Sequence, residues 1–126
     1  MNLVDSSGWL EYFADGPNAG FFAASIEAHA DLLVPTIALF EVFKRLRQQR
    51  GEDEALQAIS AMQSGTVVDL DAPLALDAGR LSIEHRLPLA DSIVLATARA
   101  HDATLWTQDA DFKNIAEVKF VERRAR

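Results

Sequence analysis

Cysteine is absent from this chain of 126 residues, and so are apolar runs long enough to cross a membrane. Without cysteine the chain cannot form disulfides, cysteine-ligated zinc sites or iron–sulfur clusters, and it has no thiol nucleophile. The longest stretch without a charged residue, Ala55–Val68, has 14 residues and includes Gln, Ser and Thr. A membrane-spanning helix needs about 20 mostly apolar residues, so we expect no membrane segment.

Basic residues are absent from the first 43 positions, so the N-terminus lacks the positively charged segment that begins a secretory signal peptide. We therefore expect a cytoplasmic protein. What is present is ordinary for a globular protein, since 49% of the residues are apolar and 25% are charged. Chains divide into several domains only above about 250 residues, so we expect a single domain over residues 1–126.

The formal net charge is −7, from 12 basic and 19 acidic residues, which argues against a general nucleic-acid binder. Net charge does not describe a local groove, however, and most of the basic residues are clustered. One group is Lys44, Arg45, Arg47 and Arg50, and the other is Lys119, Arg123, Arg124 and Arg126. Either group alone fits a solvated helix face or a frayed tail. Together they fit two phosphate-binding patches, of which the first supplies our candidate contacts to a nucleic-acid backbone.

Short apolar runs alternate with longer helical segments along the chain. The expected strands are Asn2–Val4, Leu32–Val34, Thr66–Val68, Thr104–Trp106 and Lys119–Val121. The expected helices are Gly8–Phe13, Ala19–Ala30, Ile37–Gln49, Glu52–Ser64, Ala72–Glu84 and Ala90–His101, with one further helical turn over Asp111–Ile115. This alternation predicts the α/β class, as a three-layer α/β/α sandwich with a mostly parallel sheet of about five strands.

Two local features refine this prediction. Thr36 is expected to cap the helix that follows it, and Pro73 lies in the first turn of its helix, where proline is tolerated. Five of the seven phenylalanines are most simply core residues, and these are Phe21, Phe22, Phe40, Phe43 and Phe112.

Acidic residues stand where strands end or where the following helices begin. Asp5 follows the first strand and Asp109 follows the fourth, whereas Glu41 lies one turn into the third helix and Asp91 lies at the start of the sixth. Ligands of open parallel sheets bind beyond the carboxyl ends of the strands. We therefore expect these four carboxylates to converge on one edge of the sheet.

Each of these acids also has a purely structural explanation. Asp5 and Asp91 are suitable helix N-caps, and Glu41 is one turn from Arg45, with which it can pair. Asp109 and Asp111 are suitable for Asx turns. Taken singly, each acid favours its structural explanation, so the hypothesis of a shared site depends on the set.

A set of four clustered carboxylates needs a cation. Two carboxylates about 4 Å apart repel each other by about 4 kcal/mol at an effective dielectric constant of 20. Mg²⁺ and Mn²⁺ prefer oxygen ligands, and a metal held in this way activates water for displacement at phosphorus. The acids therefore suggest phosphodiester hydrolysis, with the hydroxyls of Ser6, Ser7 and Thr107 orienting the acids or a metal-bound water.

The chain resembles the PIN-domain ribonucleases, and among them the VapC-type toxins of bacterial toxin–antitoxin pairs, over about residues 3–121. The segments that carry the resemblance are Asp5-Ser6-Ser7, Ala38-Leu39-Phe40-Glu41-Val42, Leu89-Ala90-Asp91-Ser92-Ile93 and Thr107-Gln108-Asp109-Ala110-Asp111-Phe112. No segment is specific alone. Their order and spacing on a chain of this length carry the similarity.

The resemblance implies a PIN-like fold and a metal-dependent endoribonuclease. Asp5, Glu41, Asp91 and Asp109 would be both the catalytic residues and the ligands of Mg²⁺ or Mn²⁺, with Thr107 supporting them and Asp111 as a weaker candidate. The basic residues from Lys44 to Arg50 would contact the RNA backbone. The resemblance also implies a homodimer inhibited by a cognate antitoxin, with DNA bound only through that antitoxin.

Two alternatives remain. One is a catalytically silent binding module on the same fold, which only an activity measurement separates from an enzyme. The other is a phosphoacceptor receiver domain, which has a similar length and an acidic Mg²⁺ pocket. A receiver would depend on Asp69 or Asp71 after the third strand, whereas a nuclease would depend on Glu41 and Asp91.

Overall fold

Five short strands form one sheet within residues 1–125, the part of the chain that the computed structural model describes. They are β1 (Asn2–Val4), β2 (Leu32–Pro35), β3 (Thr66–Val68), β4 (Thr104–Thr107) and β5 (Val118–Phe120). All four strand pairs are parallel, and the order across the sheet is β3-β2-β1-β4-β5. The predicted α/β class is confirmed, with a sheet that is entirely parallel.

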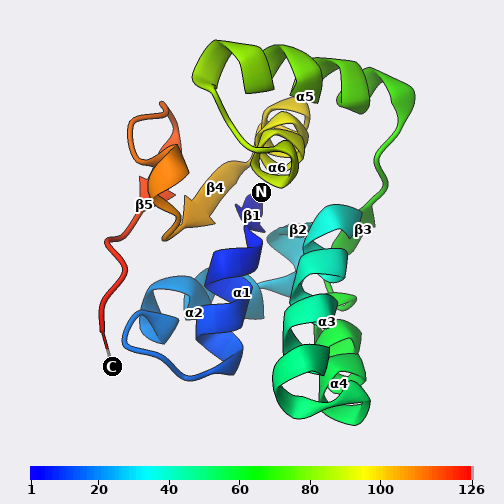
Figure 1. Ribbon diagram of the computed structural model, residues 1–126, viewed down its shortest axis with the longest axis vertical. Helices are drawn as coiled ribbons and strands as arrows, with labels where there is room; N and C mark the ends of the chain where they lie inside the picture. The colour runs from blue at the N-terminus through cyan, green and yellow to red at the C-terminus, as the bar shows by residue number, and fades with distance from the viewer. Residues whose placement is uncertain (126) are drawn as a thin grey trace.

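Helices cover both faces of this sheet (Figure 1). One face carries α1 (Ser6–Phe13), α2 (Ala19–Glu27), α3 (Thr36–Arg50) and α4 (Glu52–Met62), and the other carries α5 (Ala72–His85) and α6 (Leu89–Ala100). Short 3₁₀ turns, η1 (His29–Asp31) and η2 (Ala110–Phe112), precede β2 and follow β4. The chain is therefore the predicted three-layer α/β/α sandwich.

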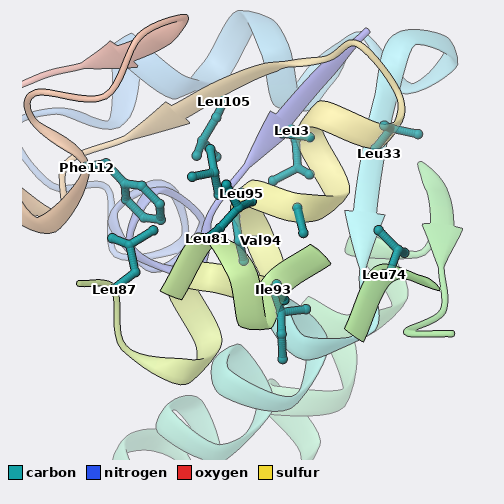
Figure 2. Packing of buried hydrophobic residues seen from close by; sticks show 13 residues of the cluster. Leu3, Leu33, Leu74, Leu81, Leu87, Ile93, Val94, Leu95, Leu105 and Phe112 are labelled. Atoms are coloured by element: carbon teal, nitrogen blue, oxygen red, sulfur yellow. The ribbon is translucent and has the colours of Figure 1, made fainter. Parts of the chain in front are cut away.

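Side chains alternate along the strands, so the sheet separates two hydrophobic clusters. Leu3 of β1 packs with α5 and α6, whereas the next residue, Val4, packs with α1–α4. Figure 2 shows the first cluster, in which Leu3 and Leu105 of the sheet meet Val94 and Leu95 of α6. Helix α6 is buried along its whole middle, from Ser92 to Ala98, because it crosses the sheet beneath α5.

The strand order fixes where a ligand can bind. From β1 the chain moves outward to β2 and β3, and then returns on the other face through α5 and α6 to pair β4 with the free side of β1. The direction of winding thus reverses between β1 and β4, and the crevice beyond their carboxyl ends is the usual ligand site of such sheets. Asp5 follows β1 and Asp109 follows β4, so both acids lie at this reversal.

The same order excludes the receiver alternative. A receiver sheet has the order 2-1-3-4-5, in which the acids after its first and third strands are neighbours. Here β2 lies between β1 and β3, and β3 is an edge strand. Asp69 and Asp71 are exposed, and Asp71 caps α5 by accepting a hydrogen bond from the backbone of Leu74 at 2.9 Å.

Three local predictions need correction. Helix α1 begins at Ser6, two residues earlier than expected, because the Asp5 side chain caps it. Thr36 is the first residue of α3 and not its cap, since Pro35 occupies the extended N-cap position without a side-chain bond. Phe40 is 59% exposed and is not a core residue, although the other four phenylalanines predicted to be in the core are buried or half-buried.

The membrane prediction can also be checked within residues 1–125. None of the helices described there combines the length and the apolar character that a bilayer crossing requires.

Candidate functional site

Asp5 is the most enclosed acid of the predicted set, with an exposed fraction of 3%. Its Oδ1 accepts hydrogen bonds from Ser7 Oγ at 2.7 Å and from the backbone N–H of Gly8 at 3.1 Å. Its Oδ2 accepts one from Thr107 Oγ1 at 2.7 Å. Burial raises the pKa of Asp5 to about 6, against the opposing effect of these three donors and with a smaller contribution from Asp109. The capping role and a place in the acidic cluster therefore coexist.

Thr107 links the ends of the two central strands. This fully buried residue ends β4, donates its hydroxyl hydrogen to Asp5 after β1, and accepts the backbone N–H of Asp109 at 2.9 Å. One hydroxyl group thus holds both the side chain of Asp5 and the backbone of Asp109 in position.

Asp91, Asp109 and Asp111 form a cluster beside Asp5. Each offers a carboxylate oxygen, and these atoms all lie within 4.8 Å of one another. Burial is the largest cause that raises the pKa of Asp91, and together with the charge of Asp109, a hydrogen bond with Asp111 and the charge of Asp5 it brings that pKa to about 8. The side chain of Asp109 also accepts the N–H of Asp111 at 2.9 Å, which is the Asx turn considered from the sequence.

Asp91 has no capping role. Pro88 is the N-cap of α6, and Asp91 is the third residue of the helix, in its first turn. The partial positive charge at a helix N-terminus favours a carboxylate there. It does not offset burial and neighbouring acids, since the pKa of Asp91 is raised to about 8.

Glu41 lies apart from the three-carboxylate cluster. It is half-buried on α3, and its Oε1 accepts a hydrogen bond from Ser6 Oγ at 2.9 Å. No ion pair within 4 Å joins it to Arg45 among residues 1–125. Consecutive serines therefore hold two acids: Ser6 bonds Glu41 and Ser7 bonds Asp5.

A groove of about 410 Å³ adjoins the acids. Ser6, Ser7 and Glu41 line it on the acidic side, and its other lining residues include three arginines: Arg45, Arg50 and Arg123. Ser7, one of these lining residues, also donates to Asp5 and so joins the wall of the groove to the buried acid. The groove therefore combines three guanidinium groups with the carboxylates of Glu11 and Glu41.

The predicted basic patch divides into two pairs. Arg47 and Arg50 form ion pairs with Glu52 and Glu54 at the start of α4, at 3.3 and 3.9 Å. Lys44 and Arg45 have no carboxylate within 4 Å among residues 1–125. These two cations carry the charge of α3 that is not compensated by a partner.

Arg123, which was not among the predicted site residues, reaches the groove because a buried polar network holds the C-terminal segment. Asn18, 1% exposed, donates to Gln108 Oε1 and to the backbone oxygen of Glu122, both at 2.9 Å. Arg124 donates to Asn18 Oδ1 at 2.8 Å and to the backbone oxygen of Pro17 at 2.6 Å. Arg126 of the same basic group lies outside the described residues. Asn18 and Gln108 are 90 positions apart, so the sequence pattern gave no signal for this network.

The residues present fit a divalent metal ion. Several carboxylates share a small volume, and the pKa of Asp91 is raised to about 8 because burial and, after it, the neighbouring acids oppose its negative charge. A cation would relieve that repulsion, and a donor set made only of carboxylate and hydroxyl oxygens suits Mg²⁺ or Mn²⁺. The cluster contains no soft ligand that would favour zinc or copper.

Comparison with known proteins agrees with this geometry. A family model described as the PIN domain matches residues 3–118. A toxin–antitoxin complex from Klebsiella pneumoniae includes a chain that is 25% identical with a TM-score of 0.76, covering 94% of this chain and 95% of that one. VapC20 from Mycobacterium tuberculosis, a toxin that cleaves the sarcin–ricin loop, is 20% identical with a TM-score of 0.77, over 99% of this chain and 100% of its own.

A third structure, VapBC2 from Rickettsia felis bound to a DNA fragment of its promoter, is 15% identical with a TM-score of 0.73, covering 96% of this chain and 97% of that one. No curated protein sequence matches this chain.

Proposed function

The chain belongs to the PIN domain family, and on that premise we propose that it is a metal-dependent endoribonuclease of the toxin–antitoxin type. The observation that carries this proposal is the meeting of carboxylates from three distant segments at the winding reversal of the sheet. Asp5 after β1, Asp91 in α6 and Asp109 after β4 influence one another electrostatically. Such a set is costly for a protein that does not bind a cation there.

We assign Asp5, Glu41, Asp91 and Asp109 as the catalytic and metal-binding carboxylates, and Asp111 joins them because its oxygen lies in the same cluster. Mg²⁺ is the expected ion, and Mn²⁺ is the expected substitute. A bound divalent ion stabilises charge on the phosphoryl oxygens and lowers the pKa of a coordinated water.

The surrounding residues position these acids and the substrate. Thr107 holds Asp5 by donating to Oδ2, and Ser6 holds Glu41 at the edge of the groove. Arg45, Arg50 and Arg123 line the groove and bind backbone phosphates, so that a phosphodiester reaches the carboxylates. Fixed positioning of this kind supplies much of the rate enhancement in phosphoryl chemistry.

The relatives support the choice of substrate and partner. VapC20 is a toxin that cleaves the sarcin–ricin loop, and the Klebsiella pneumoniae structure is a toxin–antitoxin complex. We propose that this chain cleaves RNA in the cytoplasm, acts as a homodimer, and is inhibited by a cognate antitoxin. DNA would be bound only through that antitoxin, and the VapBC2 structure with promoter DNA is consistent with such an assembly.

The test is to incubate the purified chain, free of any partner, with total cellular RNA in Mg²⁺, in Mn²⁺ and in EDTA. Wild-type protein should give discrete fragments with either metal and none in EDTA. Asp5→Asn and Asp91→Asn should give no fragments, because each removes a carboxylate of the cluster.

Asp69→Asn is the matched control, since Asp69 is an exposed acid that follows the edge strand β3 and should leave cleavage unchanged. If folded wild-type protein cleaves nothing with either metal, the enzyme assignment is wrong and the silent binding module replaces it.

A further inference from the structure

Phe40 is exposed in a helix that has no need of it for packing. Helix α3 buries Ala38, Val42 and Leu46, which are spaced four residues apart and form its inward stripe. Phe40 lies two positions from Ala38, roughly 200° around the helix, and is 59% exposed. The helix thus presents a large aromatic ring to solvent on the side opposite to its core contacts.

The surroundings of this ring are polar and charged. Phe40 lines a shallow groove of about 270 Å³ together with Glu41, Lys44, Arg45 and Gln48, and it is the only apolar residue of that lining. Glu41 and Arg45 also line the larger groove beside the acids. The two grooves therefore share an edge, and Phe40 stands one residue from the carboxylate that we assign to catalysis.

Uncompensated positive charge flanks the ring. The ammonium nitrogen of Lys44 lies 5.8 Å from the centre of the Phe40 ring, a cation–π arrangement. Within residues 1–125 neither Lys44 nor Arg45 has a carboxylate within 4 Å. An aromatic ring that shares a groove with two cations free of carboxylate partners matches the repeating unit of a nucleic acid, in which a flat base alternates with a phosphate.

We propose that Phe40 stacks on an unpaired base of the RNA strand while Lys44 and Arg45 bind the adjoining phosphates. This inference rests on the proposed function and adds to it a residue that positions the substrate, since the Phe40 ring would hold an unpaired base next to the cleaved bond. Bases inside a helix are already stacked and present only their edges, so the ring selects single-stranded segments.

Two alternatives for the ring are weaker on physical grounds. A protein partner would bury several apolar residues together at the centre of its interface, whereas this groove offers one. The second alternative is that the Phe40 ring serves only as the cation–π partner of Lys44. This is less favourable than base stacking, because stacking of a base on an aromatic side chain contributes more binding free energy than an exposed cation–π contact. The lysine side chain is flexible enough to move from the ring to a phosphate.

The experiment measures binding and cleavage separately. Fluorescence anisotropy in EDTA, where no cleavage occurs, gives the Kd of a labelled single-stranded oligoribonucleotide for wild type, Phe40→Ala and Phe40→Trp. We expect Phe40→Ala to bind about tenfold more weakly and Phe40→Trp to bind as wild type does. The matched control is Ile83→Ala, which removes an even more exposed apolar side chain from α5 on the other face of the sheet and should change nothing.

Two further ligands sharpen the test. A blunt RNA duplex should bind wild type and Phe40→Ala equally, since it has no free base to stack. An oligoribonucleotide lacking the base at the stacked position should also remove the difference between the two proteins. In cleavage assays with Mg²⁺, Phe40→Ala should raise KM about tenfold and leave kcat within about twofold.

The stacking proposal is overturned if Phe40→Ala binds single-stranded RNA as tightly as wild type does. It is also overturned if the loss is the same for duplex, or if the variant changes only self-association in light scattering. These outcomes differ from failure of the proposed function, in which wild-type protein itself neither binds nor cleaves RNA.

Discussion

At the scale of single residues, the protonation of Asp91 links the acidic cluster to stability. Its pKa in the folded, metal-free protein is about 8, above the value near 4 of an unfolded chain. A raised pKa favours folding while the group is protonated, so this contribution is fully present below pH 4 and is lost as the pH rises through about 8. Asp5, whose pKa is raised to about 6, acts in the same direction at lower pH.

We therefore predict that the Tm of the protein in EDTA falls between pH 5 and pH 9, and that Asp91→Asn flattens this fall. At pH 9 the variant should be more stable than wild type by about 1 kcal/mol, or about 3 °C, a reduced figure because the side chain is only half-buried. Circular dichroism melts across the pH range measure both. A wild-type Tm that rises over this range would contradict the assignment of the shift.

Thr107 leads to a second prediction at this scale. Thr107→Val keeps the shape but removes the donor to Asp5 and the acceptor for Asp109 N–H, leaving buried polar atoms without partners. We expect a loss of about 1–3 kcal/mol in the free energy of unfolding, measured by urea titration in EDTA. Mn²⁺ binding should weaken as well.

Thr107→Ser retains the hydroxyl and serves as the control. It should restore Mn²⁺ affinity even where the lost methyl group lowers stability. Equal Mn²⁺ affinity in the valine and serine variants would show that the hydroxyl does not position the acids.

At the scale of elements, the contact between α1 and the sheet depends on Gly8. A Cβ at this position would lie 2.6 Å from Val4 Cγ1 and 2.7 Å from Phe22 Cδ1, too close for either side chain to remain in place. Overpacking of this kind costs about 1–3 kcal/mol, more than the gain of up to about 1 kcal/mol that alanine brings to a helix. Gly8→Ala should therefore destabilise the protein and displace Ser6 and Ser7, with a loss of cleavage.

The matched control is Gly79→Ala in α5, where an added Cβ meets nothing within 4 Å. This variant should be more stable by about 0.5–1 kcal/mol and should cleave as wild type does. Urea unfolding of the two variants side by side distinguishes close packing from helix propensity. If the two variants change the free energy of unfolding by the same amount, the contacts of Gly8 with Val4 and Phe22 are not what excludes a larger side chain from α1.

The sequence predicted these elements well because their signals are local. Apolar runs bounded by Gly, Pro and Asp gave the strands and helices to within a few residues, and Asp71 with Pro73 indicated the start of α5. The prediction that Phe40 is a core residue was wrong because it followed from the apolar side chain and not from the position of Phe40 in the helical repeat. The spacing of Ala38, Val42 and Leu46 points Phe40 outward, so a signal was present in the chain.

The candidate site was predictable only in part. Asp5, Asp91 and Asp109 stood out because strand ends and helix starts are local features that share one edge of a parallel sheet. The strand order was not readable, because it depends on how the long connections cross the sheet. Arg123 was not predicted as a site residue either, since its place in the groove depends on contacts such as that of Asn18 with Gln108, 90 positions away.

At the scale of the whole molecule, the chain has a net charge of −7, yet one of its grooves is lined by three arginines. If RNA is the substrate, as we propose, its long-range steering would be weak, and its binding would depend on the local contacts of Lys44, Arg45, Arg50 and Arg123. If each neutralises one phosphate of a single strand, the logarithm of the association constant should fall with the logarithm of salt concentration with a slope of about −3.

We predict that Arg123→Gln makes this slope shallower by about 0.7, as loss of one phosphate contact requires. Anisotropy titrations between 50 and 200 mM salt measure it. Arg80→Gln is the control, because Arg80 pairs with Asp77 on α5, on the other face of the sheet, and should leave the slope unchanged. An unchanged slope in Arg123→Gln would remove Arg123 from the RNA path.

The brevity of β1 has a consequence for how this chain can change over evolutionary time. Three residues alone set the register that sends Leu3 to one core, Val4 to the other, and Asp5 to the edge where the acids meet. Exchanging one aliphatic residue for another here would alter packing modestly. Inserting or deleting a single codon would swap both faces at once and move the carboxylate from its position. Among related sequences we therefore expect the aliphatic residues of β1 to be exchanged for one another while the number of residues in β1 stays fixed.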